Sequence, residues 1–226
     1  PKGTTRAFNR AEQLTVLRIG VPVGLHFIAE SGVFSLVGVL AAALSANDSA
    51  AHNVALNWGS LTFCVTAGIG SAAATRVGWG IGRGDTPAAR RAGMTGFISA
   101  ALFMAASSVV FLLIPRPLAA LMSDDPEVIS TVMALFVVVA VFQISDGVQA
   151  VGAGALRGTG DTRFTFYVNL IGHWLIGLPV AWWLGMRGSW GVVGLWWGLC
   201  AGLTFVALAL LVRFAITTRG HIAALQ

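Results

Sequence analysis

Six apolar stretches, each long enough for a helix that crosses a lipid bilayer, make up most of the sequence. A hydrocarbon core about 30 Å thick needs roughly 20 residues of helix. Short turns rich in polar residues, glycine or proline separate the stretches. We therefore predict an all-α integral membrane protein with one domain over residues 1–226 and six transmembrane helices, at about 14–44, 50–80, 87–114, 126–156, 162–186 and 190–214.

The composition supports a membrane protein and excludes other classes. Of the 226 residues, 56% are hydrophobic and only 10% are charged, whereas soluble domains carry about 25% charged residues. A chain this apolar is not intrinsically disordered, because disorder requires low hydrophobicity and high charge. The basic residues are not gathered among aromatic residues, so nucleic acid is not an expected partner.

The Lys and Arg residues predict how the chain is oriented. Only Arg116 and Arg187 fall on one side of the predicted spans, and the other twelve fall on the opposite side. Those twelve are Lys2, Arg6, Arg10, Arg18, Arg76, Arg83, Arg90, Arg91, Arg157, Arg163, Arg213 and Arg219. Basic residues accumulate on the cytoplasmic side of membrane proteins. We therefore predict a multi-pass protein of the cell (inner) membrane with both termini cytoplasmic, and we attribute the basic excess to topology rather than to a specific lipid site.

Two carboxylates stand far from the ends of the predicted spans: Glu30 near the middle of the first and Asp146 in the fourth. A charged side chain at bilayer depth costs about 2.5–3.5 kcal/mol, so such residues almost always face a cavity or a partner. The spans contain no lysine. We interpret both acids as groups that hold a proton or bind a cation. The alternative is a protonated carboxyl that bonds one helix to another.

Polar residues at helical spacing accompany both acids. Gln143 and Gln149 each lie three residues from Asp146 and share one helix face with it. His26 lies one helical turn before Glu30, where it is either a packed, hydrogen-bonded histidine or a proton relay. These residues are candidates for the lining of a cavity.

The second span carries Asn53 and Asn57, which are also one turn apart. The two asparagines either line a cavity or bond helix to helix. Cys64 and Cys200 stand alone in apolar runs without metal-binding spacing, so no metal site is expected from them. The sequence contains no GxSxG or HExxH motif. We therefore expect neither an enzyme nor an organic cofactor.

Four segments in order carry a family resemblance: VPVGLHFIAESGVFS, AAHNVALNWGSLTF, GIGSAAATRVGWGIGRGD and QISDGVQAVGAGALRGTGDTR. Together they resemble the C-terminal six-helix lobe of multidrug and toxic-compound extrusion (MATE) transporters of the NorM-like branch. The resemblance implies a twelve-helix transporter with two six-helix lobes around a central cleft. It also implies that the N-terminal lobe, a partner of this one, is absent from this chain.

The resemblance further implies a cation site at Glu30 and Asp146, with H+ or Na+ as the coupling ion. The family often has an aromatic hydroxyl four residues before this aspartate, where this chain has Phe142. That difference removes an oxygen ligand and weakens the case for sodium. The implied function is cation-coupled antiport that exports amphipathic or cationic drugs, with Phe34 and Phe142 as apolar contacts for the substrate.

Two other functions remain open at this point. A lipid or polysaccharide-precursor flippase of the same superfamily would have a larger and more basic cavity, which the two acids disfavour. A non-transporting half-transporter or structural subunit would have no use for two unpaired carboxylates within the membrane.

Overall fold

Long helices account for nearly all of the structure. The computed structural model describes residues 10–220, and within them no strand occurs. The five longest helices are α1 (Arg10–Leu44), α2 (Ala46–Gly82), α3 (Thr86–Leu113), α5 (Pro126–Gly158) and α8 (Gly191–Thr217). The short α4 (Pro115–Ala120) follows α3, and α6 (Thr162–Leu170), η1 (Ile171–Gly177), α7 (Leu178–Trp182) and η2 (Trp183–Arg187) follow one another without a break. The predicted all-α fold is confirmed.

The helix ends follow from local chemistry. The side chains of Ser45, Asp85 and Asp125 cap α2, α3 and α5 by accepting backbone N–H hydrogen bonds of 2.8–2.9 Å. The turn between α2 and α3 contains Gly84 with φ of +70°, a left-handed conformation that glycine adopts without strain. The sequence did not predict α4, which forms in the Pro-Arg-Pro segment expected to be a simple break.

The predicted fifth span is not a regular α-helix. It contains two π-helical segments, η1 and η2, with α7 between them. Pro179 lies in the first turn of α7 and cannot donate a backbone hydrogen bond. A π-helical turn commonly accompanies such an interruption of the hydrogen-bond ladder.

Five segments are long and apolar enough to cross a membrane: Val16–Leu44, Thr86–Leu113, Pro126–Gly158, Thr162–Arg187 and Gly191–Thr217. The second predicted span, α2, is 37 residues long but is not among them. Its many Ser, Thr, Asn and Gly residues make it less apolar than the other long helices. That α2 also crosses the membrane stays a prediction.

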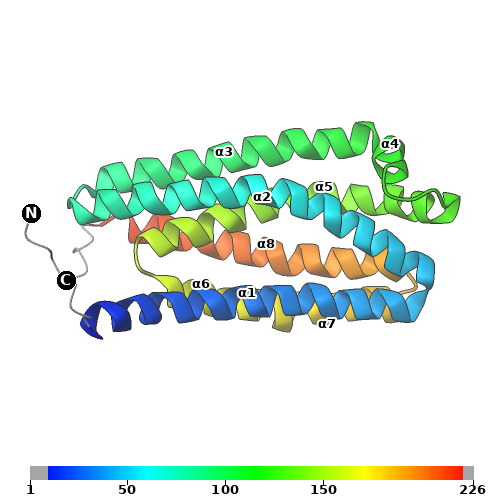
Figure 1. The fold of residues 1–226 in the computed structure, drawn as a ribbon, viewed down its shortest axis with the longest axis horizontal. Helices are drawn as coiled ribbons and strands as arrows, with labels where there is room; N and C mark the ends of the chain where they lie inside the picture. Colours follow the sequence, from blue (N-terminus) through cyan, green and yellow to red (C-terminus); the bar gives the residue numbers. More distant parts are fainter. Residues whose placement is uncertain (1–9, 221–226) are drawn as a thin grey trace, which may run out of the picture.

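The helices pack around α5. This helix contacts α2, α3 and α8, while α8 contacts η1, α7 and η2. In Figure 1, α2 and α3 lie on one side of the bundle and α1 lies with α6 and α7 on the other. Gly154 of α5 touches the backbone of Gly70 in α2, so the two helices approach more closely there than any side chain would allow. In contrast, α1 and α2 separate after the turn at Ser45 (Figure 1). Residues of both helices line a cavity there.

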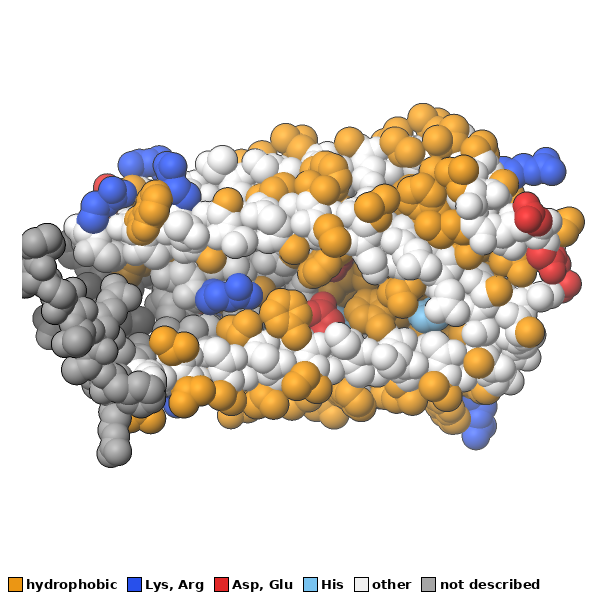
Figure 2. Space-filling model, in the orientation of Figure 1, with side chains coloured by type: hydrophobic (Ala, Val, Ile, Leu, Met, Phe, Trp, Pro, Cys, Tyr) orange, Lys and Arg blue, Asp and Glu red, His pale blue; other side chains and the backbone are white. Residues whose placement is uncertain are grey.

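The basic residues separate by end of the bundle, as predicted. Figure 2 shows Lys and Arg side chains gathered where α2 ends and α3 begins, and few along the middle of this face. The start of α1 and the end of α8 lie at that same end (Figure 1). Lys2 and Arg6 lie outside the described residues. Which end faces the cytoplasm stays a prediction.

Candidate ion and substrate cavity

The hollow between α1 and α2 is a cavity of about 500 Å³. Its walls come from α1 and α2, and its base comes from α5 and α8. Figure 2 shows it as an opening in the middle of the molecule, with carboxylate and histidine side chains inside. The lining residues are Phe27, Glu30, Ser31, Phe34, Ser35, Gly38, His52, Asn53, Leu56, Gly59, Ser60, Phe63, Phe142, Asp146 and Trp196.

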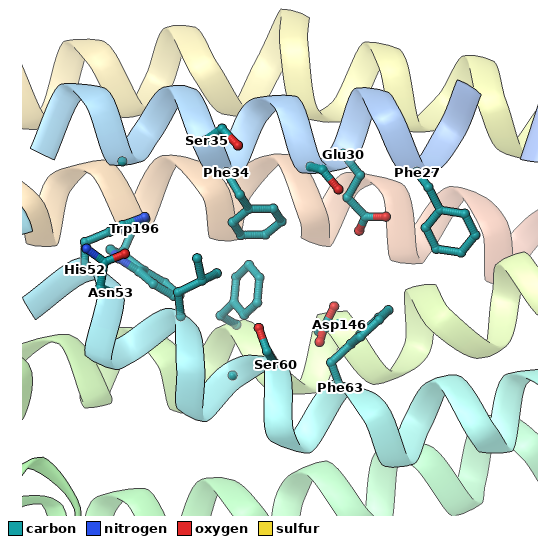
Figure 3. Close-up of a pocket in the computed structure, with 15 residues that line it drawn as sticks. Phe27, Glu30, Phe34, Ser35, His52, Asn53, Ser60, Phe63, Asp146 and Trp196 are labelled. Atoms are coloured by element: carbon teal, nitrogen blue, oxygen red, sulfur yellow. The ribbon is translucent and has the colours of Figure 1, made fainter. Parts of the chain in front are cut away.

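Both intramembrane carboxylates reach this cavity. Glu30 extends from α1 and Asp146 extends from α5, and both side chains point into the same space (Figure 3). Only 12% of the Glu30 side chain and 6% of Asp146 are exposed to solvent. Residues 116 positions apart in the sequence thus share one partly dry site.

Glu30 is held by hydrogen-bonding side chains on both of its oxygens. His26 Nε2 lies 3.3 Å from Glu30 Oε2, and Gln149 Nε2 donates to Glu30 Oε1 at 3.2 Å. The same Gln149 nitrogen donates to Asn169 Oδ1 at 3.1 Å. In turn, Asn169 Nδ2 donates to the backbone oxygen of Thr165 at 2.9 Å. The network ties α1 to α5 and α6 and fixes the orientation of the carboxyl group.

Asp146 has a different environment. Within the described residues no side chain or backbone group donates a hydrogen bond to it. A buried carboxylate without donors is strongly disfavoured unless it gains a proton or a cation. Asp146 is therefore the carboxylate more readily available to an incoming ion, while Glu30 is already solvated by protein groups.

Aromatic rings form the apolar part of the cavity. The Phe34 and Phe142 rings meet edge to face with centroids 6.0 Å apart, and Phe142 meets Trp196 in the same way at 5.5 Å. Phe27 and Phe63 stand beside the two carboxylates (Figure 3). Flat apolar surfaces next to carboxylates suit an amphipathic cation, because ring faces attract positive charge.

A narrow extension of about 80 Å³ leaves the cavity near Glu30 and reaches Arg157. His26, Gln149 and Arg157 all line it. We expected Arg157 in the loop between the fourth and fifth spans, but α5 continues to Gly158 and keeps this arginine on the bundle. Its Nε is buried and has no hydrogen-bond partner among the described residues.

The other candidate residues divide into two groups. Phe34, Phe142 and Asn53 line the cavity, and Gln149 and His26 line its extension. The amide of Asn53 also donates to the backbone oxygen of Ser49 at 2.9 Å.

Gln143 does not line the cavity, contrary to the expectation, and Asn57, for which a bond between helices was the alternative, does not line it either. Asn57 is exposed on α2, away from the cavity, and Gln143 is fully buried with no partner for its amide in the described part of the chain. A spacing of three residues leaves side chains about 60° apart around a helix. Gln143 therefore turns into the helix packing while Asp146 faces the opening.

Several residues of the candidate site could not be identified from the sequence. Asn169 enters the Glu30 network from α6, and His52 and Trp196 pack at the far end of the cavity with ring centroids 5.8 Å apart. An asparagine inside an apolar span was the available signal for Asn169. No pattern in the sequence links Trp196 to Glu30 or Asp146.

A bundle of membrane-crossing helices with two carboxylates in an open, aromatic-lined cavity has the features of a membrane transporter. Comparison with known proteins identifies the transporter family. The chain belongs to the MatE family, whose model matches residues 22–183. The resemblance noted in the sequence is thus confirmed.

Curated relatives are multidrug resistance proteins. The chain is 42% identical to the multidrug resistance protein NorM of Burkholderia vietnamiensis, over 92% of this chain and 46% of that protein. It is 39% identical to PmpM of Pseudomonas aeruginosa, over 95% of this chain and 46% of the relative. It is 33% identical to the multidrug resistance protein MdtK of Cronobacter sakazakii, over 97% of this chain and 49% of that protein. The chain spans about half the length of the curated relatives that it matches.

The chain also covers about half the length of the solved structures that it matches. The eukaryotic MATE transporter AtDTX14 matches with a TM-score of 0.82 and 25% identity, over 90% of this chain and 47% of that one. A MATE structure in complex with MaL6 matches with a TM-score of 0.87 and 15% identity, over 94% of this chain and 48% of that one. The fold is therefore that of one lobe of a MATE transporter.

Proposed function

We propose that this chain is the C-terminal lobe of an antiporter that exports amphipathic or cationic drugs from the cytoplasm in exchange for H+ or Na+. The observation that carries the proposal is the pair Glu30 and Asp146 in one open cavity between helices. The relatives named as multidrug resistance proteins support the drug as substrate. A second lobe of the same transporter would supply the other wall of the central cleft.

The two carboxylates allow an ion and a drug to exclude each other. A cationic drug in the aromatic part of the cavity gains from the negative charge of Glu30 and Asp146. A coupling ion on Asp146 cancels part of that charge and weakens the hold on the drug. Ion binding then favours whichever arrangement of the lobes releases the drug, because a ligand shifts an equilibrium by its differential affinity for the two states.

The lining favours a proton over sodium as the coupling ion. Sodium requires several oxygen ligands around one point, and Phe142 provides none where a hydroxyl would help. Both Glu30 oxygens already contact nitrogen donors on His26 and Gln149. A proton needs only one free carboxylate oxygen, which Asp146 offers.

The lining also favours a drug transporter over a flippase. Among the described residues, the main cavity is lined by two acidic residues and by no Lys or Arg, whereas an anionic lipid or polysaccharide precursor would require a basic site. Nothing in this arrangement favours catalysis, so we propose a transporter and not an enzyme. An inactive subunit is the remaining alternative.

Drug efflux from proteoliposomes tests the proposal, with the complete protein encoded by the gene and an imposed H+ or Na+ gradient. Glu30→Gln and Asp146→Asn should each reduce gradient-driven efflux by tenfold or more. Each tenfold loss of rate corresponds to about 1.4 kcal/mol of activation free energy. Matched controls are Glu127→Gln and Asp124→Asn, which remove exposed carboxylates outside the cavity. Wild-type efflux from both cavity variants at equal membrane incorporation would overturn the coupling role. The gradient that drives efflux identifies the ion.

A further inference from the structure

A second hollow lies outside the transport cavity, between α2 and α3. It is a groove of about 440 Å³ and shares no lining residue with the cavity that contains Glu30 and Asp146. The α2 side presents Ile69, Ala72 and Arg76, and the α3 side presents Arg91 and Thr95. A groove of this size is within the range of sites that hold small molecules.

Two unpaired arginines stand at one end of this groove. Arg76 and Arg91 come from different helices, and both are exposed. In the described part of the chain, neither makes an ion pair, a hydrogen bond or a contact with an aromatic ring. Arg76 lies six residues before the end of α2, and Arg91 lies five residues after the start of α3. At 1.5 Å per residue these positions are about 7–9 Å inside the helix ends.

That depth matches the headgroup layer of a bilayer. Arginine side chains near helix ends extend toward the membrane surface while their methylene groups stay on apolar surface. Trp79, one turn from Arg76, is 59% exposed, and exposed tryptophans mark the membrane interface. Further from the helix ends, the groove is lined by Ile69 and Ala72. The groove is therefore cationic at its mouth and mainly apolar toward the membrane centre, where Ile69, Ala72 and Gly96 line it beside the hydroxyl groups of Thr95 and Ser99.

This polarity is that of one phospholipid molecule with a negatively charged headgroup. We propose that the groove between α2 and α3 binds an anionic phospholipid from the leaflet at this end of the bundle. The phosphate group would lie between Arg76 and Arg91, which can each donate two parallel hydrogen bonds to it. An acyl chain would follow the apolar floor along Ile69 and Ala72.

The convergence of two helices distinguishes this pair from the other basic residues at the same end. Arg83 lies at the C-terminal boundary of α2 and Arg90 lies next to Arg91, but neither lines the groove. Orientation of the chain in the membrane needs only positive charge near the helix ends. A lipid site requires cationic groups above an apolar channel, and Arg76 and Arg91 both line the same groove.

The experiment uses the complete protein encoded by the gene, purified in mild detergent and titrated with phosphatidylglycerol. Bound lipid is counted by native mass spectrometry. Arg76→Gln with Arg91→Gln should weaken phosphatidylglycerol binding by about tenfold or more, because two charged contacts are lost. The matched control, Arg83→Gln with Arg90→Gln, removes the same charge from the same end and should keep wild-type binding. Phosphatidylcholine should bind weakly to all three proteins.

Two further measurements keep the proposal falsifiable if the first double variant does not fold. Ala72→Phe keeps both arginines but fills the groove, and it should also lose phosphatidylglycerol. Glycerol phosphate should not compete with the lipid, since it lacks the acyl chain. Equal loss of binding in the two double variants would overturn the proposal in favour of a diffuse surface charge. Full competition by glycerol phosphate would overturn it in favour of a soluble anion site.

Discussion

Gln149 offers the sharpest test of the hydrogen-bond network around Glu30. Its side-chain nitrogen donates to Glu30 Oε1 at 3.2 Å and to Asn169 Oδ1 at 3.1 Å, and the residue is 1% exposed. Replacement by leucine keeps a similar volume and removes both donors. A hydrogen bond to a charged group contributes about 1.5–3 kcal/mol and a neutral one about 0.5–1.5 kcal/mol. Gln149→Leu should therefore lower the free energy of unfolding by roughly 2–4 kcal/mol.

Gln143→Leu is the matched control, because it makes the same change on the same helix. Gln143 is also fully buried, but no group in the described residues bonds its amide. Removing a buried polar group that has no partner is neutral or stabilising, so the expected change is within about 1 kcal/mol of zero. Reversible unfolding in mixed micelles, followed by tryptophan fluorescence, measures both variants.

The charge on Glu30 can be separated from the geometry by a double-mutant cycle. In a Glu30→Gln background the acceptor oxygen remains but the negative charge is gone. The cost of Gln149→Leu should then fall by about 1 kcal/mol or more. Equal destabilisation by Gln149→Leu and Gln143→Leu, or a cost that does not change in the Glu30→Gln background, would refute the network as described.

Three more predictions follow from the packing and the charges. Gly198→Ala should destabilise the protein by about 1–3 kcal/mol, because the added carbon would overlap the backbone of Ala181. The control Gly68→Ala, whose added carbon meets nothing within 4 Å, should leave stability unchanged. Thermal unfolding compares the two variants. In a variant without native cysteines, a membrane-impermeant thiol reagent added to intact cells should label Asp124→Cys and not Arg83→Cys; the opposite result would invert the topology. Arg157→Gln should tighten binding of a cationic dye a few-fold, because it removes a positive charge from the extension of the cavity. Arg163→Gln, a change at an exposed residue, should leave the dye affinity unchanged. Unchanged dye affinity in both variants would contradict a role for Arg157 in the cavity.

The elements and their order could be predicted from the sequence because the apolar runs are long and the turns are chemically distinct. The caps at Asp85 and Asp125 follow from a carboxylate placed before a proline-containing first turn. The π-helical segments of the fifth span could not be predicted, since they depend on how the chain around Pro179 packs against α8. The short α4 was missed because two prolines in three residues favour a break over a helix.

The two carboxylates could be singled out from the sequence for a simple reason, and the family resemblance joined them in one site. Acidic residues are so costly in a membrane that Glu30 and Asp146 stand out without any structural knowledge. Their surroundings could not be predicted in the same way. The hydrogen bond from Gln149 to Glu30 joins residues 119 positions apart, and sequence spacing carries no information about contacts between helices. The exclusion of Gln143 from the cavity likewise depends on the rotation of α5.

The unequal hydrogen bonding of the two acids leads to an order of events in the proposed transporter. Glu30 is solvated by His26 and Gln149, whereas Asp146 accepts no hydrogen bond within the described residues. An entering proton should therefore bind Asp146 first and leave Glu30 charged. The cavity then keeps one negative charge, which is enough to retain a monovalent cationic drug at reduced strength. Release becomes complete only when Glu30 is also neutralised, and a proton on Oε2 requires that His26 stop donating to that oxygen, while Oε1 can still accept from Gln149. On this argument Asp146 senses the ion and Glu30 controls release of the drug, so Asp146→Asn should chiefly abolish the response to the gradient while Glu30→Gln should chiefly weaken drug affinity.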